Sequence, residues 1–221
     1  MKKKLIILLL LIPLIFTGCK KIDRTISEEI KTNDKYSKNI EVKSTKLDDT
    51  IILFLTNKNN ITIDTDITIN FYDKKKKLIA NSEDTYSAIT PKKEIVISFE
   101  VFKDYDYYEI TLSSQKTKYT NYENDISIAE NDNKKEKEIT FEINNNSKNT
   151  IEYIEIAILF YKNKQLVAHD SKYIFKLKKD KKATIEFIYP YTDEFKELEF
   201  DSYKVYTNEA CSYNKETKDE G

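Results

Sequence analysis

Few residues of this 221-residue chain could perform chemistry, and their spacing matches no common catalytic site. His169 is the only histidine, and Cys19 and Cys211 are the only cysteines, so a zinc or iron site has too few ligands. A Ser-His-Asp triad would have to use His169, and the sequence has no Gly-x-Ser-x-Gly elbow. Glycine occurs only at Gly18 and Gly221, which excludes a phosphate-binding loop. We therefore expect no metal, no cofactor and no enzymatic activity, and we place His169 in a surface turn.

Carboxylates and tyrosines are the remaining candidates. Paired acids could serve a glycosidase or bind calcium, but acids that alternate along a strand usually only solvate its outer face. The acids concerned are Asp64, Asp66, Asp84, Asp104 and Asp106. Exposed aromatic side chains can bind sugars or partner proteins, although tyrosine also suits half-buried strands for packing reasons alone. If the protein has a binding face, the tyrosines predicted to form it are Tyr105, Tyr107, Tyr108, Tyr189 and Tyr191.

The start of the chain has the pattern of a secretory signal peptide. Three lysines at 2–4 precede an apolar stretch at 5–16, which is too short to cross a membrane because a spanning helix needs about 20 residues. The segment Phe16-Thr17-Gly18-Cys19 then resembles a bacterial lipobox, with Phe16 where leucine is usual. The resemblance implies removal of the signal peptide (1–18), acylation of Cys19 with palmitate-type chains, and attachment to the extracytoplasmic face of the cell membrane. The alternative is an ordinary signal peptide with a cysteine placed there by chance.

Composition limits the partners of the remaining chain. Without the three signal lysines, 34 basic residues face 38 acidic ones, and the charges are interspersed, so nucleic-acid binding is not indicated. If Cys19 is lipidated, Cys211 has no partner for a disulfide, and core packing must stabilise the fold. We expect Cys211 at a strand end or in a tail. Because glycine is absent from the folded region, Asn and Asp are expected to make the turns.

Apolar residues alternate with polar ones along most of the chain from Ile40, which predicts half-buried strands. The pattern occurs twice, since six segments recur in the same order. In the clearest match, Thr65-x-Ile67-x-Ile69-x-Phe71-Tyr72 corresponds to Ile154-x-Ile156-x-Ile158-x-Phe160-Tyr161. Two units of about eighty residues with six or seven short strands each are typical of immunoglobulin-like β-sandwiches.

The predicted organisation is therefore all-β, with two tandem immunoglobulin-like sandwiches after a signal peptide and a short tether. We place the tether at 19–38, where Thr25-x-x-Glu28 could cap a short helix, and the two sandwiches at 39–119 and 120–207. Residues 208–221 are predicted to form a disordered tail.

Several segments resemble a known bacterial module. They are Asn146-Ser147-x-x-Thr150-Ile151-x-Tyr153-Ile154-Glu155-Ile156, the aromatic pairs Phe71-Tyr72 and Phe160-Tyr161, and the closing Ser202-Tyr203-Lys204-Val205. Both units are similar in this way to FxLYD-type domains, which are small immunoglobulin-like sandwiches common in lipoproteins of Gram-positive bacteria. The family's Pro-Gly turn is replaced here by Pro91-Lys92 and Lys179-Asp180. Its motifs are structural, so the resemblance implies a fold and no catalytic residue.

Three functions remain open at this point. The first is a membrane-anchored envelope lipoprotein with a non-catalytic interaction or scaffolding role and a protein or glycan partner. The second is a lipoprotein that binds a solute or glycan between the two units, in a deep cleft lined by aromatics. The third, and weakest, is a hydrolase, which two carboxylates converging in a cleft would favour.

Overall fold

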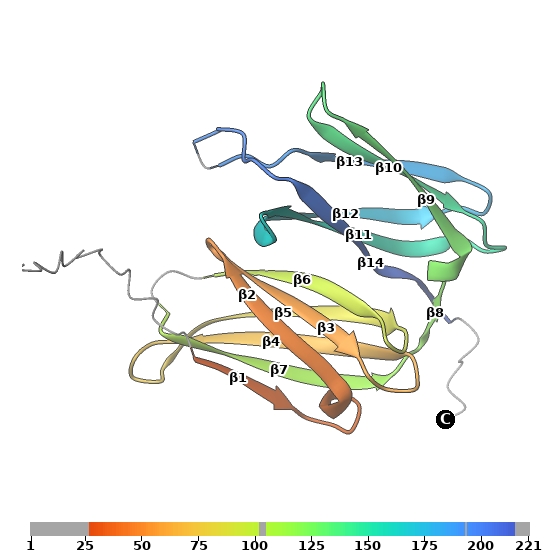
Figure 1. Cartoon of the computed structure of the whole chain (residues 1–221). Helices are drawn as coiled ribbons and strands as arrows, with labels where there is room; N and C mark the ends of the chain where they lie inside the picture. Colours follow the sequence, from red (N-terminus) through yellow and green to blue (C-terminus); the bar gives the residue numbers. More distant parts are fainter. Residues whose placement is uncertain (1–26, 102–104, 193, 215–221) are drawn as a thin grey trace, which may run out of the picture.

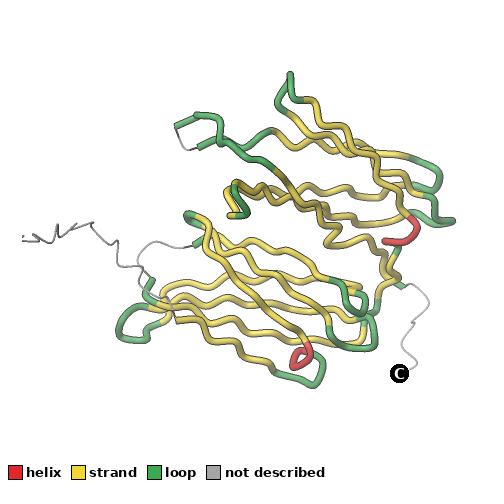
Figure 2. The backbone as a smooth tube through the Cα atoms, viewed as in Figure 1, coloured by secondary structure: helices red, strands yellow, loops and turns green. Residues whose placement is uncertain are grey.

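The computed structural model describes residues 27–101, 105–192 and 194–214, and this part of the chain consists almost entirely of β-strands (Figures 1 and 2). The strands form two consecutive sandwiches, here called unit 1 and unit 2. The prediction of an all-β chain with two tandem immunoglobulin-like sandwiches is confirmed. No helix within the described residues is long and apolar enough to cross a membrane.

Unit 1 consists of a four-stranded sheet and a three-stranded sheet. The four-stranded sheet has the order β1 (Ser27–Thr32), β7 (Tyr107–Lys116), β4 (Ile63–Tyr72) and β5 (Leu78–Ile89). The three-stranded sheet has the order β2 (Ile40–Leu47), β3 (Thr50–Asn57) and β6 (Glu94–Glu100). A short 3-10 helix, η1 (Ser37–Asn39), precedes β2.

Unit 2 repeats this arrangement. Its four-stranded sheet has the order β8 (Tyr119–Asn121), β14 (Ser202–Tyr213), β11 (Ile151–Lys162) and β12 (Gln165–Leu177). Its three-stranded sheet has the order β9 (Ile126–Asn133), β10 (Glu138–Asn145) and β13 (Lys182–Ile188), and the 3-10 helix η2 (Glu123–Asp125) precedes β9. Strands β2 to β7 therefore correspond in order to strands β9 to β14.

Each unit has its own hydrophobic core, because alternate residues of its strands face the space between its two sheets. In β10, for example, Ile139, Phe141 and Ile143 are buried while the residues between them are only half-buried. Side chains that alternate in this way bury one face of each sheet and leave the other available for water or for a second layer. The two cores contain fifteen buried residues each.

An asparagine at the equivalent position supports the turn after β3 in unit 1 and after β10 in unit 2. In unit 1, the Asn57 side-chain nitrogen donates to the carbonyls of Ile61 (3.0 Å) and Ile89 (2.8 Å), and its oxygen accepts from the Asn59 amide (2.8 Å). In unit 2, Asn145 makes the same three bonds, to the carbonyls of Asn149 and Leu177 (2.8 Å each) and from the Ser147 amide (2.9 Å). Both asparagines are 1% exposed. The duplication seen in the sequence therefore extends to individual hydrogen bonds.

The residues that adopt positive φ in place of glycine are not mainly the expected Asn and Asp. Positive φ angles among the described residues occur at Asp48, Asn163 and Asp180, but more often at lysines and also at Ala88 and Phe195. The lysines are Lys76, Lys92, Lys137, Lys164 and Lys176. The prediction that Asn and Asp make the turns is therefore only partly right.

Two predicted boundaries are wrong. The predicted tether includes Ser27–Thr32, yet this segment forms β1 and pairs in parallel with β7 along the edge of unit 1. The predicted tail begins at residue 208, yet β14 continues to Tyr213 and pairs there with β8. In both units a strand from the preceding segment completes the four-stranded sheet, so the sequence that looks like a connection is part of the fold. The signal peptide, Cys19, residues 20–26 and 215–221 lie outside the described residues.

Candidate functional site

The two units lie face to face and form four layers of sheet (Figure 1). A hydrophobic cluster joins them: Ile52 and Val96 from the three-stranded sheet of unit 1 contact Ala157, Leu159 and Tyr206 from the four-stranded sheet of unit 2. Ile52 and Leu159 are 0% exposed although they point away from the cores of their own units. The outer faces of these two sheets are therefore buried against each other.

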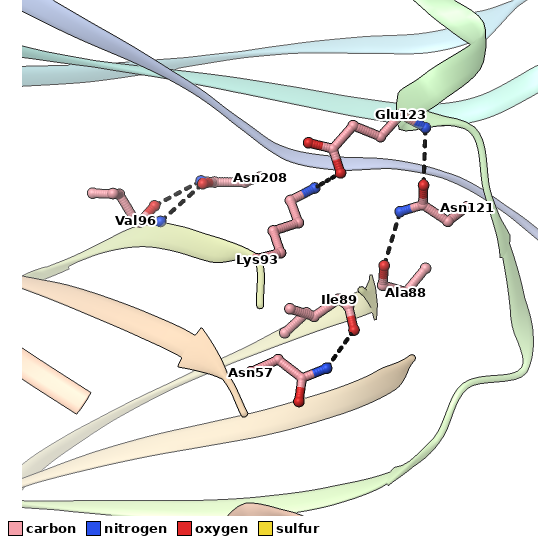
Figure 3. A network of polar contacts seen from close by, with 8 residues as sticks. All are labelled: Asn57, Ala88, Ile89, Lys93, Val96, Asn121, Glu123 and Asn208. Atoms are coloured by element: carbon pink, nitrogen blue, oxygen red, sulfur yellow. Dashed lines mark hydrogen bonds and ion pairs between the residues drawn. The ribbon is translucent and has the colours of Figure 1, made fainter. Parts of the chain in front are cut away.

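Polar contacts at one end of this interface involve β8, η2 and β14 of unit 2 (Figure 3). The Asn208 side chain accepts from the Val96 amide (2.9 Å) and donates to the Val96 carbonyl (2.6 Å), which imitates a backbone pair between two sheets. Asn121 donates to the Ala88 carbonyl (2.9 Å), and the buried Lys93 ammonium lies 2.7 Å from a Glu123 carboxylate oxygen. These directional bonds fix the orientation of the units, since buried polar groups lose free energy when unpaired.

Two buried carboxyl groups also lie in this interface. Glu155 on β11 is opposite Glu209 on β14, and the two side chains are 2% and 5% exposed. Glu209 accepts from the Ser87 amide of unit 1, and Glu155 accepts from the Asn208 side chain (3.2 Å). Burial, with a smaller contribution from a nearby acid, raises the pKa of Glu155 to about 7 and that of Glu209 to about 8. At neutral pH the pair is therefore at least partly protonated.

A small cavity lies beside Glu155, between the units. It measures about 40 Å³ and is lined by side chains that include Asp84, Tyr86, Glu155, His169 and Tyr173. This volume holds a few water molecules, whereas small-molecule pockets usually measure about 300 Å³ or more. No group of three or more potential metal ligands occurs within the described part of the chain. The converging carboxylates therefore have no space for a sugar or peptide substrate between them.

Of the other titratable candidates, His169 and Asp64 lie in places that the sequence did not predict, whereas Cys211 lies near the end of a strand, as predicted. His169 is not in a surface turn: it lies on β12 at the inter-unit interface, where burial lowers its pKa. Cys211 is buried within β14, and burial raises the pKa of its thiol to about 12, which makes it a poor nucleophile. Asp64 does not solvate an outer face: it is 5% exposed and accepts hydrogen bonds from the Ala88 amide (2.8 Å) and the Thr117 hydroxyl (2.6 Å).

The remaining candidate acids differ in their exposure to solvent. Asp66 and Asp84 are exposed, as the alternation predicts, and Asp106 is half-buried. Asp104 lies outside the described residues.

The three candidate tyrosines of unit 1 are largely built into the fold. Tyr108 is 7% exposed, and its hydroxyl lies 3.0 Å from the Ser44 hydroxyl. The half-buried Tyr105 packs edge-on against Phe71 with ring centres 5.2 Å apart. Tyr107 stacks on Tyr72 at 4.8 Å. These rings stabilise one end of unit 1 and leave little free aromatic surface.

The two candidate tyrosines of unit 2 differ from each other. Tyr189 is 7% exposed, and its hydroxyl donates to Asp132 (2.6 Å). Tyr191 is 49% exposed and lines a groove of about 520 Å³ between the two units. Leu47, Asp48 and Thr50 of unit 1 form the other wall of this groove. The five tyrosines do not converge on one site, and only Tyr191 faces a space between the units.

A second aromatic cluster was missed by the sequence analysis. Tyr153 on β11 contacts Tyr173 and Phe175 on β12, with ring centres 5.7 Å and 5.4 Å apart, on the side of the sheet that faces away from the unit 2 core. Tyr173 is 47% exposed and Phe175 68% exposed. We call these three residues the aromatic platform. The alternation Tyr173-x-Phe175 puts both rings on one face and could have signalled it, but without the partner strand it reads as ordinary strand sequence.

Comparisons with known proteins give no family for this chain. No family model matches it, and the comparison with curated proteins found no match. Among solved structures, a red sea bream transglutaminase matches with a TM-score of 0.20 and 8% sequence identity, over 76% of this chain and 28% of that one. The chain thus spans less than a third of that protein's length, and a likeness this weak says nothing about function.

Proposed function

We propose that this protein is a lipoprotein anchored through Cys19 to the extracytoplasmic face of the cell membrane, with a non-catalytic interaction role in the envelope. The signal-peptide pattern and the lipobox-like Phe16-Thr17-Gly18-Cys19 support the anchor. Two acyl chains on one cysteine hold a protein stably where one chain is marginal. The FxLYD-type resemblance of both units agrees with this role, because that module is common in lipoproteins.

The main support for the interaction role is the close packing of the two units around the acid pair. Its cavity of about 40 Å³ leaves the acid pair without a substrate site, so recognition has to use side chains that stay exposed at the margin of this contact. The aromatic platform is the best contact surface there, since it presents three touching rings on β11 and on β12, a strand with a free edge. Aromatic residues with fixed orientation supply large contact area at low entropic cost, whether the partner is a protein or a glycan.

A capture experiment tests this role. The chain that begins after Cys19 would be immobilised and incubated with envelope extract, beside a Tyr173→Ser/Phe175→Ser variant. Both side chains are well exposed, but Tyr173 also lines the small cavity beside Glu155, so circular dichroism would first check that the variant is folded. We expect one defined partner to be retained by the wild type and lost by the variant. Phe195→Ser is the matched control, because Phe195 is 90% exposed but lies in the loop between β13 and β14. A partner that binds both variants equally would contradict the assignment to the platform.

The groove beside Tyr191 favours a second function, the binding of a small solute or glycan between the units. Its volume of about 520 Å³ lies within the range of ligand sites, and both units contribute to its walls. In the same capture experiment this function predicts recovery of a glycan or solute and no protein. Tyr191→Ala should then abolish binding, while the platform variant should keep it.

A further inference from the structure

The chain enters unit 1 at a defined end of the molecule. β1 is parallel to β7, so Ser27 lies opposite Tyr107, and Tyr107 in turn lies opposite Tyr72 at the end of β4. The turn between β4 and β5, at residues 73–77, follows Tyr72 directly. This turn and the start of β1 therefore lie at the same end of unit 1 (Figure 1).

This turn has an unusual composition for a structured hairpin. Asp73 orders it by accepting from the amides of Lys75 (2.8 Å) and Lys77 (2.9 Å), and Lys76 has a φ of 61°. The four consecutive lysines at 74–77 are exposed, and none of them forms an ion pair with another described residue. Leu78 and Ile79, which follow, are 49% and 42% exposed. Four free cations thus lie beside two exposed aliphatic side chains.

Two other lysines at this end of the molecule are paired with acids. Lys137 lies 3.0 Å from Glu197, and Lys162 lies 3.1 Å from Glu199, so the acidic loop between β13 and β14 pairs with the neighbouring turns of unit 2. The turn of unit 1, with four consecutive lysines, therefore has the densest positive charge among the described turns at this end, and it lies close to Ser27, where the described chain begins.

We propose that the turn at 74–77, with Leu78 and Ile79, is a second membrane contact, which binds the anionic phospholipid surface of the membrane that carries the anchor. This proposal rests on the proposed anchoring at Cys19. The eight residues from Cys19 to Ser27 span at most about 29 Å, so this end of unit 1 stays near the bilayer. A lysine is attracted to an anionic surface within about one Debye length, and adjacent aliphatic side chains enter the headgroup region.

Vesicle sedimentation tests the contact separately from the anchor. The probe is the unlipidated chain that begins after Cys19, whose two cores are built from residues between Tyr36 and Ala210 and so do not depend on the lipid. It would be mixed with vesicles of phosphatidylcholine alone or of phosphatidylcholine with phosphatidylglycerol, at low and high salt. We expect binding to the anionic vesicles only, and weaker binding at high salt.

The variant with all four lysines changed to glutamine should bind at least about tenfold more weakly, because four attractions to the anionic surface are lost together. Lys134→Gln/Lys135→Gln, in the turn between β9 and β10, is the control and should bind within about twofold of the wild type. Equal binding of wild type and quadruple variant, or wild-type binding that ignores lipid charge, would overturn the proposal. Failure here would leave membrane association through Cys19 intact, because the probe carries no lipid.

Discussion

Glu155 and Glu209 lie directly opposite each other on neighbouring strands, and both are buried between the two units. Two ionised carboxylates in this position would repel each other in a poorly solvated environment. The raised pKa values of about 7 and about 8 mean that the folded protein keeps protons that the unfolded chain has released. The groups facing this pair are Asp84 and Tyr86 from β5, Tyr153 from β11, Tyr173 from β12, Cys211 from β14 and, as the cation, Lys93.

This pair predicts that the free energy of unfolding falls as the pH rises from about 4.5 to about 8. In that window the folded state binds more protons than the unfolded state, so removing protons destabilises the fold. One pKa unit corresponds to about 1.4 kcal/mol, so rises from 4.5 to about 7 and to about 8 set an upper limit of about 8 kcal/mol on the fall. His169, whose pKa is lowered, acts in the opposite sense below pH 6.5. Urea denaturation at pH 5 and pH 8.5, followed by circular dichroism, measures the difference.

Glu209→Gln should flatten this dependence, because glutamine keeps the acceptor for the Ser87 amide and cannot ionise. The control is Glu83→Gln, an exposed position in β5. The pH explanation is wrong if the Glu209 variant loses stability with rising pH as steeply as the wild type does.

Asn57 and Asn145, at equivalent turns of the two units, should contribute similarly to the free energy of unfolding. Asn57→Ala removes four hydrogen bonds and Asn145→Ala three, including the bonds to two carbonyls in each turn, which should cost about 2–3 kcal/mol. Denaturation midpoints would show this beside Asn131→Ala, an exposed position in β9. A loss below about 0.5 kcal/mol at either turn, which is typical of ordinary surface positions, would refute the role assigned to these side chains.

A lysine at positive φ is a position where substitution by glycine should increase the stability of the protein. Lys176 has a φ of 55° and an exposed side chain, so Lys176→Gly should stabilise the protein by about 1 kcal/mol, because glycine adopts this conformation without steric cost. Lys178→Gly, at a nearby exposed position without positive φ, should be neutral or destabilising. If both substitutions change the denaturation midpoint in the same direction, the backbone argument fails.

The face-to-face packing of the units depends on side chains outside the two cores. Leu159→Asp places a charge opposite Ile52 in the hydrophobic cluster between the units, while both cores keep their residues. We expect each unit to stay folded and the two to separate, which increases the radius of gyration in solution scattering. Gln165→Asp, exposed on β12, is the control. An unchanged radius of gyration for the Leu159 variant would show that other contacts hold the units together.

The alternation of residues such as Ile67, Ile69 and Phe71 was sufficient to predict the sheets and their duplication, because it depends on local period alone. The roles of Ser27–Thr32 and of the end of β14 could not be predicted this way, since both are short polar segments whose pairing partners are distant in the sequence. The burial of Ile52 and Leu159 was hidden for a related reason. Period two shows that a strand has two faces, but it does not show that a second sandwich covers the outer one.

The candidate site was predicted less well than the fold. Tyr108 and Tyr189 looked like a binding face because tyrosines cluster there, yet their hydroxyls are bound within the fold. The aromatic platform depends on the pairing of β11 with β12, and the buried acid pair depends on a register shift in β11 beside β14. Such juxtapositions follow from strand register, which the sequence did not specify.

The proposed function depends most on a lipid anchor at Cys19, and membrane fractionation of Cys19→Ala tests this anchor most directly. Cells that export the wild type should retain it in the membrane fraction, whereas the variant should be released into the soluble fraction or the medium. Cys211→Ala, which alters the other thiol, should remain with the membrane. If the Cys19 variant stays bound as firmly as the wild type, the protein is not held by a lipid on this cysteine.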